Sequence, residues 1–127
     1  VLPATHPLAK ADNLPFEQLR GETFLLFPEH SFINDLCIRE CRNAGFEPHI
    51  AYTGNRGATL IDLVRNGAGI TLMMHHSARQ ENDSSLAFIP VTPGIYSYIS
   101  LNYAKEKPLS PQAESFVRYV KAHKRDF

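Results

Sequence analysis

The stretch Ala58-Thr-Leu-Ile-Asp-Leu-Val-Arg-Asn-Gly-Ala-Gly-Ile-Thr-Leu-Met-Met74 decides the fold, because it contains a helix, its stop signal and a strand. Thr59, followed three residues later by an aspartate, is a variant of the capping box that begins helices. Three apolar residues then follow at helical spacing. Gly67 predicts a left-handed end to the helix, and the short apolar run 70–74 predicts a strand buried on both faces.

Helix and strand signals alternate along the rest of the chain. Ser31 and Ser110 are good N-caps, Pro111 suits a first helical position, and Gly45 suits a helix end. Helices are therefore predicted to begin after each of the two serines. The other predicted elements are a short helix around 15–19, strands over 24–27, 49–53 and 86–91, a polar excursion over 75–85, a turn at 92–94, and an extended segment whose Tyr96, Tyr98 and Tyr103 pack in a core. This alternation predicts an α/β fold with a largely parallel sheet.

The composition is that of an ordinary globular domain. The chain has 127 residues, enough for one domain with a hydrophobic core. Its formal net charge is zero, so it carries no electrostatic footprint for nucleic acid. No apolar run approaches membrane-spanning length, and no signal peptide is visible. The glycines of 67–69 precede a strand rather than follow one, so they make no dinucleotide fingerprint and no cofactor is predicted.

The cysteines and histidines are interpreted as structural. Cys37 and Cys41 lie one turn apart on the helix after Ser31, where disulfide geometry is rarely met. We therefore expect packing residues in a reducing, cytoplasmic compartment. His75 and His76 point apart on an extended chain, whereas zinc needs three or four close ligands. No further cysteine or carboxylate pattern supplies the rest, so no metal site is predicted.

Five segments together resemble one family. They are His6-Pro-Leu-Ala9, the turn within Leu14 to Glu22, Cys41-Arg-Asn-Ala-Gly-Phe-Glu-Pro48, the stretch 58–74, and Pro108-Leu-Ser-Pro-Gln-Ala-Glu-Ser-Phe116. In this order and at this spacing they resemble the effector-binding domain of LysR-type transcriptional regulators. The stretch 58–74 is similar to the family's TL..LV..G.GI..LP signature, except that Met74 replaces the final proline. The resemblance covers nearly the whole chain.

The resemblance implies one lobe of a two-lobed sensor, of the type 2 periplasmic-binding-protein-like fold, with helices flanking a mixed, mostly parallel sheet. Residues 1–103 would form the second lobe with its crossover strands. Residues 104–127 would form a return segment and a last helix that docks on the first lobe. The family's helix-turn-helix, linker helix and first lobe have no counterpart in this sequence, so we expect a fragment of a longer regulator.

Two turns at the predicted carboxyl edge of the sheet are the candidate effector site. Open α/β sheets bind ligands at this edge, and free backbone N–H groups at a helix start favour an anion. Arg56 of the second turn could bind a carboxylate with two hydrogen bonds, or its side chain could remain in water. The first turn could equally be a plain connection whose serine only caps, and its glutamate would repel an anion unless it points outward. The candidate residues are Pro28, Glu29, His30, Ser31 and Phe32 in the first turn, Thr53, Gly54, Asn55 and Arg56 in the second, and Gly69 before the predicted strand 70–74.

We therefore expect a metabolite-sensing domain and not an enzyme. The effector, with an anion among the candidates, would bind between the lobes and shift them through its different affinity for two states. DNA contact would belong to the missing N-terminal domain, and the sensor domains would pair as dimers within a tetrameric regulator. The alternatives are a lobe of a solute-binding protein, which would need an export signal, a related enzyme, which would need clustered catalytic groups, and a stand-alone interaction module.

Overall fold

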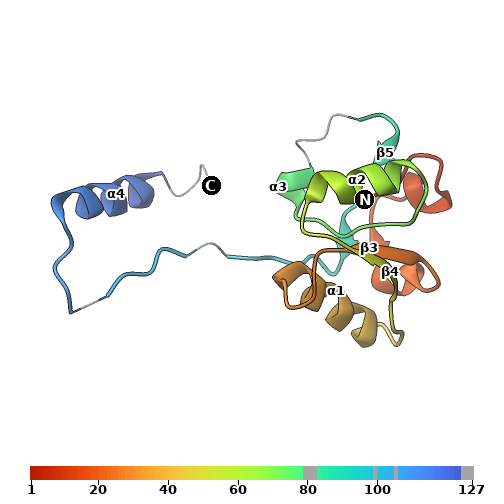
Figure 1. Ribbon diagram of the computed structural model, residues 1–127, viewed down its shortest axis with the longest axis horizontal. Helices are drawn as coiled ribbons and strands as arrows, with labels where there is room; N and C mark the ends of the chain where they lie inside the picture. The colour runs from red at the N-terminus through yellow and green to blue at the C-terminus, as the bar shows by residue number, and fades with distance from the viewer. Residues whose placement is uncertain (79–82, 99, 105, 124–127) are drawn as a thin grey trace. The chain divides into compact units, whose positions relative to one another are not determined.

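The computed structural model describes residues 1–78, 83–98, 100–104 and 106–123. The chain divides into two units, Val1–Ile95 and Tyr96–Phe127 (Figure 1). The first unit holds β1 to β6 and α1 to α3, and the second holds α4, Pro111–Ala122. The expected docking of residues 104–127 on another lobe stays a prediction.

The sheet of the first unit is built around β3, Thr23–Leu26, which runs parallel to β4, His49–Thr53. On its other side β3 meets Ile70, also in parallel. The Ile70 N–H donates to the Thr23 carbonyl and the Ile70 carbonyl accepts from the Leu25 N–H, both at 2.8 Å. Two of the predicted strands, over 24–27 and 49–53, are thereby confirmed, the first with a shift of one residue.

The sheet continues from Ile70 through the N-terminus. The Thr71 N–H donates to the Val1 carbonyl at 2.9 Å, and the Val1 ammonium donates back to the Thr71 carbonyl at 2.7 Å. β1, Leu2–Pro3, then runs antiparallel to β5, Leu86–Ala87. The named strands form three two-stranded sheets, of which β3-β4 and β2-β6 are parallel and β1-β5 is antiparallel, so the pairing is mixed and mostly parallel, as predicted.

Two strand predictions were wrong in extent. Only Ile70 of the run 70–74 forms a bridge. The segments on either side of the run pair with it over one residue each, at Phe24 on one side and at Val1 on the other. The predicted strand 86–91 is two short strands, β5 and β6, Val91–Thr92. They separate because β5 pairs with β1 whereas β6 runs parallel to β2, Leu14–Pro15.

Helix α1, Phe32–Asn43, has the predicted ends. The Ser31 hydroxyl oxygen accepts a hydrogen bond from the Asn34 N–H at 3.3 Å. Gly45 follows with a φ of 78° and its N–H donates to a carbonyl of the last turn, which is the glycine-dependent end that few other residues allow. Before it lie two 3-10 helices, η1 (Pro7–Lys10) and η2 (Phe16–Leu19), the latter in place of the predicted helix 15–19.

Helix α2, Gly57–Arg65, begins earlier than predicted. Thr59 is not its cap: the Thr59 N–H already donates to the Arg56 carbonyl inside the first turn. Arg56 occupies the cap position without a side-chain hydrogen bond. The predicted end is confirmed, because Gly67 adopts a φ of 76° and hydrogen-bonds back to the last turn.

Two hydrophobic clusters cover the two faces of the sheet. One lies under α1 and includes both cysteines, and the other lies under α2. The first comprises Leu2, Leu14, Phe16, Leu19, Phe24, Leu26, Cys37, Cys41 and Ile70, and the second Leu25, Leu60, Ile61, Val64 and Leu86. Consecutive residues of β3 enter opposite clusters, as alternating side chains of a strand buried on both faces must.

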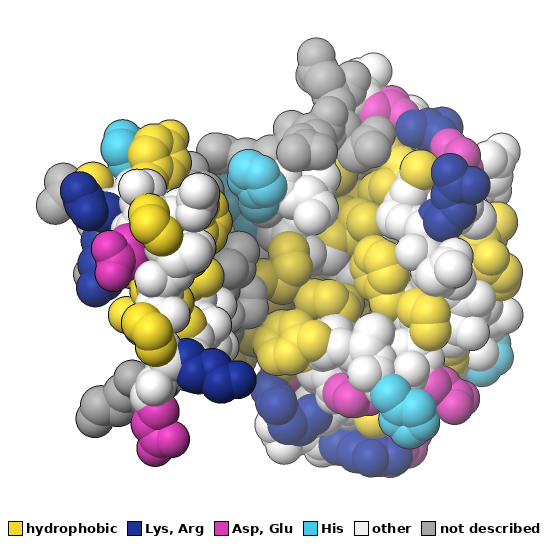
Figure 2. Space-filling view, turned by 60° about the vertical axis from the view of Figure 1, so that its left-hand side comes forward, with side chains coloured by type: hydrophobic (Ala, Val, Ile, Leu, Met, Phe, Trp, Pro, Cys, Tyr) yellow, Lys and Arg dark blue, Asp and Glu magenta, His cyan; other side chains and the backbone are white. Residues whose placement is uncertain are grey.

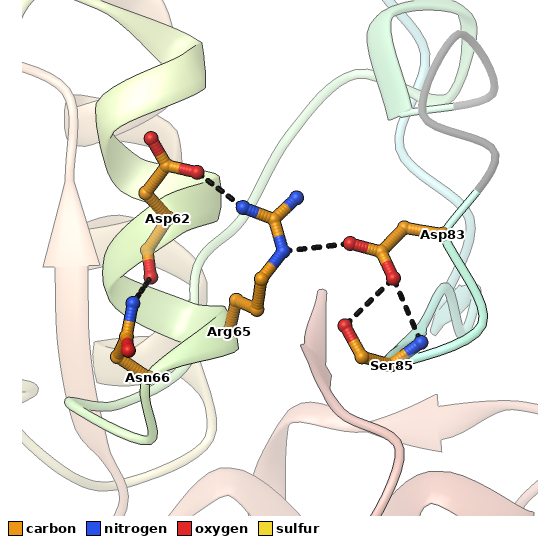
Figure 3. A network of polar contacts seen from close by, with 5 residues as sticks. All are labelled: Asp62, Arg65, Asn66, Asp83 and Ser85. Carbon is orange, nitrogen blue, oxygen red and sulfur yellow. Dashed lines mark hydrogen bonds and ion pairs between the residues drawn. The ribbon is translucent and has the colours of Figure 1, made fainter.

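The end of α2 is tied to the segment that precedes β5 (Figure 3). The Arg65 Nε donates to Asp83 at 2.7 Å, and another Arg65 nitrogen contacts Asp62 on the same helix. Asp83 also accepts from the N–H and hydroxyl of Ser85, and these bonds with the Arg65 contact lower the pKa of Asp83 to about 2. Within the predicted excursion 75–85, His75–Ala78 forms helix α3, and residues 79–82 lie outside the described residues.

The second unit contains a capped helix with no buried side chain. The Ser110 hydroxyl oxygen accepts from the Ala113 N–H at 3.2 Å, and Pro111 occupies the first turn, as predicted. Tyr96, Tyr98 and Tyr103 are exposed, so their predicted core packing is wrong. Their spacing indicates only a tendency to be buried, and among the described residues of this unit no element covers them. Among the described residues no helix combines the length and apolar character needed to cross a membrane.

Candidate functional site

The turn between β3 and α1 is held in a defined conformation. The Ser31 N–H donates to the Pro28 carbonyl at 3.1 Å, and His30 adopts a φ of 65°. A positive φ is uncommon for a residue with a side chain and is concentrated at functional sites. From within α1, the buried Asn34 amide donates to the Phe27 carbonyl at 2.8 Å. This bond fixes the start of the turn to the helix that follows it.

The second predicted turn connects β4 to α2. Its Gly54 N–H donates to the Leu26 carbonyl at 3.0 Å, which joins this turn to the end of β3. A Cβ at Gly54 would lie 2.7 Å from the Tyr52 ring, so the glycine leaves room for that ring to fold back over the turn. Asn55 and Arg56 are exposed. The guanidinium is thus free to reach solvent or an anionic ligand at the start of α2.

A third segment reaches the same edge. The ideal Cβ position of Gly57 lies 3.0 Å from the Met73 methyl carbon and 3.8 Å from the Phe27 ring. The start of α2, the end of β3 and the segment after Ile70 therefore meet at one place. Figure 2 shows hydrophobic side chains gathered on one face of the molecule, with charged and histidine side chains near their margin. At the edge itself, the apolar side chains of Phe27 and Met73 meet beside Gly57 and form an apolar floor.

A shallow pocket of about 490 Å³ lies on one flank of this edge, between α1 and β4. Glu29, His30 and Thr53 of the predicted set line it, together with Asp35 and Tyr52. Its two carboxylates and the lack of a lining lysine or arginine make it unfavourable for an anion. The arginine of the second turn is not among its lining residues. An anion is therefore better placed towards α2 than in this pocket.

The remaining predicted residues are divided. Phe32 is the first residue of α1 and is 56% exposed. The Ser31 hydroxyl oxygen is already used as the hydrogen-bond acceptor of the helix cap. Gly69 lies away from the others, beside Thr23 at the opposite end of β3. A Cβ at Gly69 would collide with the Thr23 carbonyl oxygen. This glycine permits close backbone contact and does not line the edge where the two turns meet.

The cysteines are placed as packing residues. Cys37 and Cys41 are free thiols, and both are fully buried on the inner face of α1. Their mutual hydrogen bond raises the pKa of the Cys37 thiol, which burial raises further, and lowers the pKa of the Cys41 thiol. The packing role of both cysteines therefore rests on their complete burial, which keeps reactants away from the two thiols. Within the described ranges, no three His, Cys, Asp or Glu side chains lie close enough to hold a metal ion.

Sequence reasoning missed three residues of this region. Asn34 was missed because a polar residue is not expected in a core. Its place on the apolar side of a helix, three positions after a capping serine, is nevertheless a signal for a buried hydrogen bond. Tyr52 was assigned only to a strand, and the glycine two positions later was the clue to its orientation. Met73 stood inside an apolar run that reads as core.

The family model of the LysR substrate binding domain matches residues 1–125. The chain belongs to this family. It is 29% identical to the transcriptional dual regulator GltC of Bacillus subtilis (strain 168) over 121 residues, which is 94% of this chain and 40% of GltC. It is 36% identical to the HTH-type transcriptional regulator TtuA of Agrobacterium vitis over 83 residues, which is 61% of this chain and 26% of TtuA. The chain spans about two fifths of GltC.

Solved structures of LysR-family domains share the fold. The regulatory domain of Synechocystis PCC6803 CcmR, in complex with 2-PG, matches with a TM-score of 0.80 at 17% identity, over 99% of this chain and 62% of that one. The effector binding domain of QuiR, in complex with shikimate, matches with a TM-score of 0.72 at 21% identity, over 96% of this chain and 60% of that one. At these identities the likeness establishes the fold, which is that of the LysR effector-binding domains.

Proposed function

We propose that this LysR substrate-binding chain senses a small metabolite at the carboxyl edge of its first unit. The observation that carries the proposal is the meeting of Phe27, Gly57 and Met73 at that edge, bordered by the two hydrogen-bonded turns. Ligands of open α/β sheets bind outside the carboxyl ends of the strands. Two structural neighbours, CcmR and QuiR, were solved with small molecules, 2-PG and shikimate, which supports the same class of ligand here.

The binding chemistry follows from the two turns. The backbone N–H groups at the start of α2 and the exposed Arg56 favour a negatively charged group. Glu29 lies on the flank with Asp35 and so does not face the start of α2 in this arrangement. We assign Pro28–Phe32 and Thr53–Arg56 to the border of the effector site, and leave Gly69 out of it.

Regulation requires the rest of a longer protein. The effector would be held between this unit and a first lobe, and its differential affinity for two lobe arrangements would supply the free energy of the switch. DNA binding would be carried out by a separate N-terminal domain in an oligomeric, cytoplasmic regulator. Residues 104–127 would dock on the first lobe, because Phe116 and Tyr119 of α4 present apolar surface that favours burial.

We propose regulation rather than catalysis as the main role. The relatives named above are transcriptional regulators, and the candidate edge brings together an apolar floor and one arginine rather than an acid, a base and a nucleophile in hydrogen-bond contact. A lobe of a solute-binding protein or of an enzyme on the same fold is the alternative. Reporter transcription that follows the ligand, rather than uptake or turnover of it, separates these hypotheses.

The test is a thermal-shift screen of metabolites against the full-length regulator. A metabolite that binds the proposed edge should raise the melting temperature of the native protein and of Arg39→Gln, which changes an exposed arginine on α1 far from the second turn. Arg56→Gln should reduce the shift if the ligand is anionic. A ligand whose shift is unaffected by Arg56→Gln and by every substitution in the two turns would contradict this site.

A further inference from the structure

We propose that Met73 is a specificity-determining residue of the effector site. Together with Phe27 it forms an apolar floor that selects effectors carrying a ring or an alkyl group beside their polar group. The proposal rests on the function proposed above and adds the chemical class of the effector. It is carried by the contact of both side chains with Gly57 and by their partial accessibility.

Met73 and Phe27 lie close together at the start of α2. The Met73 methyl carbon and the Phe27 ring lie 3.0 Å and 3.8 Å from the same point, the ideal Cβ position of Gly57. Phe27 directly follows Leu26, the last residue of β3. This is the edge of the sheet where the two turns leave their strands.

Met73 can lie against the start of α2 because residue 57 is glycine. The ideal Cβ of Gly57 would lie 3.0 Å from the Met73 methyl carbon, which is closer than most real contacts of this kind. Met73 thus occupies the room that a side chain at the start of α2 would need. Met73 and Phe27 are half-buried and pack against the cluster under α2. The floor is therefore continuous with the core below, and part of its surface remains accessible.

The side chain of Met73 suits a floor that adapts to its ligand. Methionine has three rotatable side-chain bonds and a polarisable sulfur that contacts aromatic rings favourably. A purely polar ligand at the border would leave this apolar surface in water, whereas a ligand with a ring would cover it. The floor therefore distinguishes amphiphilic anions from small hydrophilic ones of the same charge.

The chain offers a direct measurement, because it contains two methionines. With ¹³C-methyl-labelled methionine, each gives one NMR signal, and Met73→Leu identifies the signal of Met73. The probes are acetate and phenylacetate, which carry the same carboxylate and differ by one phenyl ring. We expect phenylacetate to shift the Met73 methyl signal at least about fivefold more than acetate does at equal concentration, through contact with the ring. Met74, which belongs to neither core cluster, serves as the internal reference.

The variant Gly57→Ala tests the floor itself. It adds a methyl group 3.0 Å from the Met73 methyl carbon, so the Met73 side chain must move, and alanine is a better helix former than glycine, so the helix should persist. Binding of phenylacetate should weaken at least about fivefold, since the floor is filled. Ala58→Ser, at the exposed neighbouring position of the same turn, should bind both probes as the native chain does.

Equal shifts of Met73 with the two acids, no shift with phenylacetate, or unchanged binding to Gly57→Ala would each overturn the proposal. The proposed function has a separate failure. A metabolite found by thermal shift that changes transcription but leaves the Met73 methyl signal in place would keep the sensor and remove the role of Met73. A domain that binds phenylacetate on Met73 but regulates no promoter would do the reverse.

Discussion

Helices α1 and α4 have the same local construction and opposite surroundings. Each has twelve residues and begins after a serine whose hydroxyl oxygen accepts from the backbone N–H three residues later, Asn34 in α1 and Ala113 in α4. Helix α1 buries Asn34, Leu36, Cys37 and Cys41 against the sheet. Helix α4 buries nothing in its own unit. Capping signals therefore determine where a helix begins, and packing determines whether it contributes to a stable core.

The strongest way to break this comparison is to remove one large side chain from each helix. Leu36→Ala should lower the free energy of unfolding of the first unit by roughly 2–5 kcal/mol, because it leaves a cavity in the core. Phe116, which is 57% exposed, should change it by less than about 0.5 kcal/mol when replaced by alanine. Urea denaturation followed by circular dichroism measures both. Similar losses for the two variants would mean that α4 is packed as tightly as α1.

A second difference between the units concerns pH. When the chain is prepared with Val1 as its first residue, burial lowers the pKa of the Val1 ammonium from 8.0 to about 5, and this group donates to Thr71 inside the sheet. Between these two pH values the unfolded chain binds more protons, so stability should rise with pH across the window. The full effect is about 4 kcal/mol, the equivalent of three pKa units.

The control for this prediction is the same chain acetylated at Val1. Acetylation removes the charge, so the acetylated chain should lose the rise in stability between pH 5 and pH 8. Denaturant midpoints measured across that range for both chains decide the question. If the acetylated chain keeps the same slope, the pH dependence comes from another group.

The hydrogen bond that Asn34 of α1 donates to the Phe27 carbonyl should give a smaller loss of stability. Among the described residues, α4 has no buried polar side chain of this kind. Asn34→Ala leaves the Phe27 carbonyl without its hydrogen bond and should cost roughly 1–3 kcal/mol. The matched control is Asn43→Ala at the exposed end of the same helix, which should cost less than about 0.5 kcal/mol. Thermal unfolding of both variants measures the difference, and equal losses would show that the bond to Phe27 is not what Asn34 contributes.

The smallest predicted effect concerns the two helix caps and should be the same size in α1 and α4. Ser31→Ala and Ser110→Ala should each cost their own helix about 1 kcal/mol, since the two caps have the same geometry. In α1 the loss should appear in the global stability of the first unit. In α4 it should appear only as faster amide hydrogen exchange in the first turn. Ser→Asn at either position, which keeps a capping oxygen, should restore most of the loss.

The same distinction explains what the sequence predicted. The beginnings of α1 and α4, the glycine ends of α1 and α2, and strand β4 were predicted because local residues determine them. The start of α2 was not predicted, because Arg56 caps it without a side-chain hydrogen bond and its first residue is a glycine. This glycine makes room for Met73, which only the folded structure reveals. Signals carried by a residue's own neighbours can be recognised without knowing the fold.

Errors arose where a distant partner decides the structure. The run 86–91 splits because its ends pair with β1 and β2, which lie more than 70 residues earlier. For the candidate site, the edge of the sheet and its two turns could be predicted from strand-to-helix order. The floor could not, since it depends on which distant segments meet at Gly57. Gly69 was included among the candidate residues, and only its approach to Thr23 shows that it lies beside the opposite end of β3.

Gly69 has a consequence for any saturation-mutagenesis map of this family member. Every substitution would place an atom on the Thr23 carbonyl, so the position should score as intolerant as a true ligand contact. The two kinds of intolerance differ in their dose response. Variants of a contact residue such as Arg56 should recover reporter output when more inducer is supplied, whereas variants of Gly69 should stay inactive at every dose. A map recorded at a single inducer concentration would count Gly69 as part of the pocket, and a map recorded at two would not.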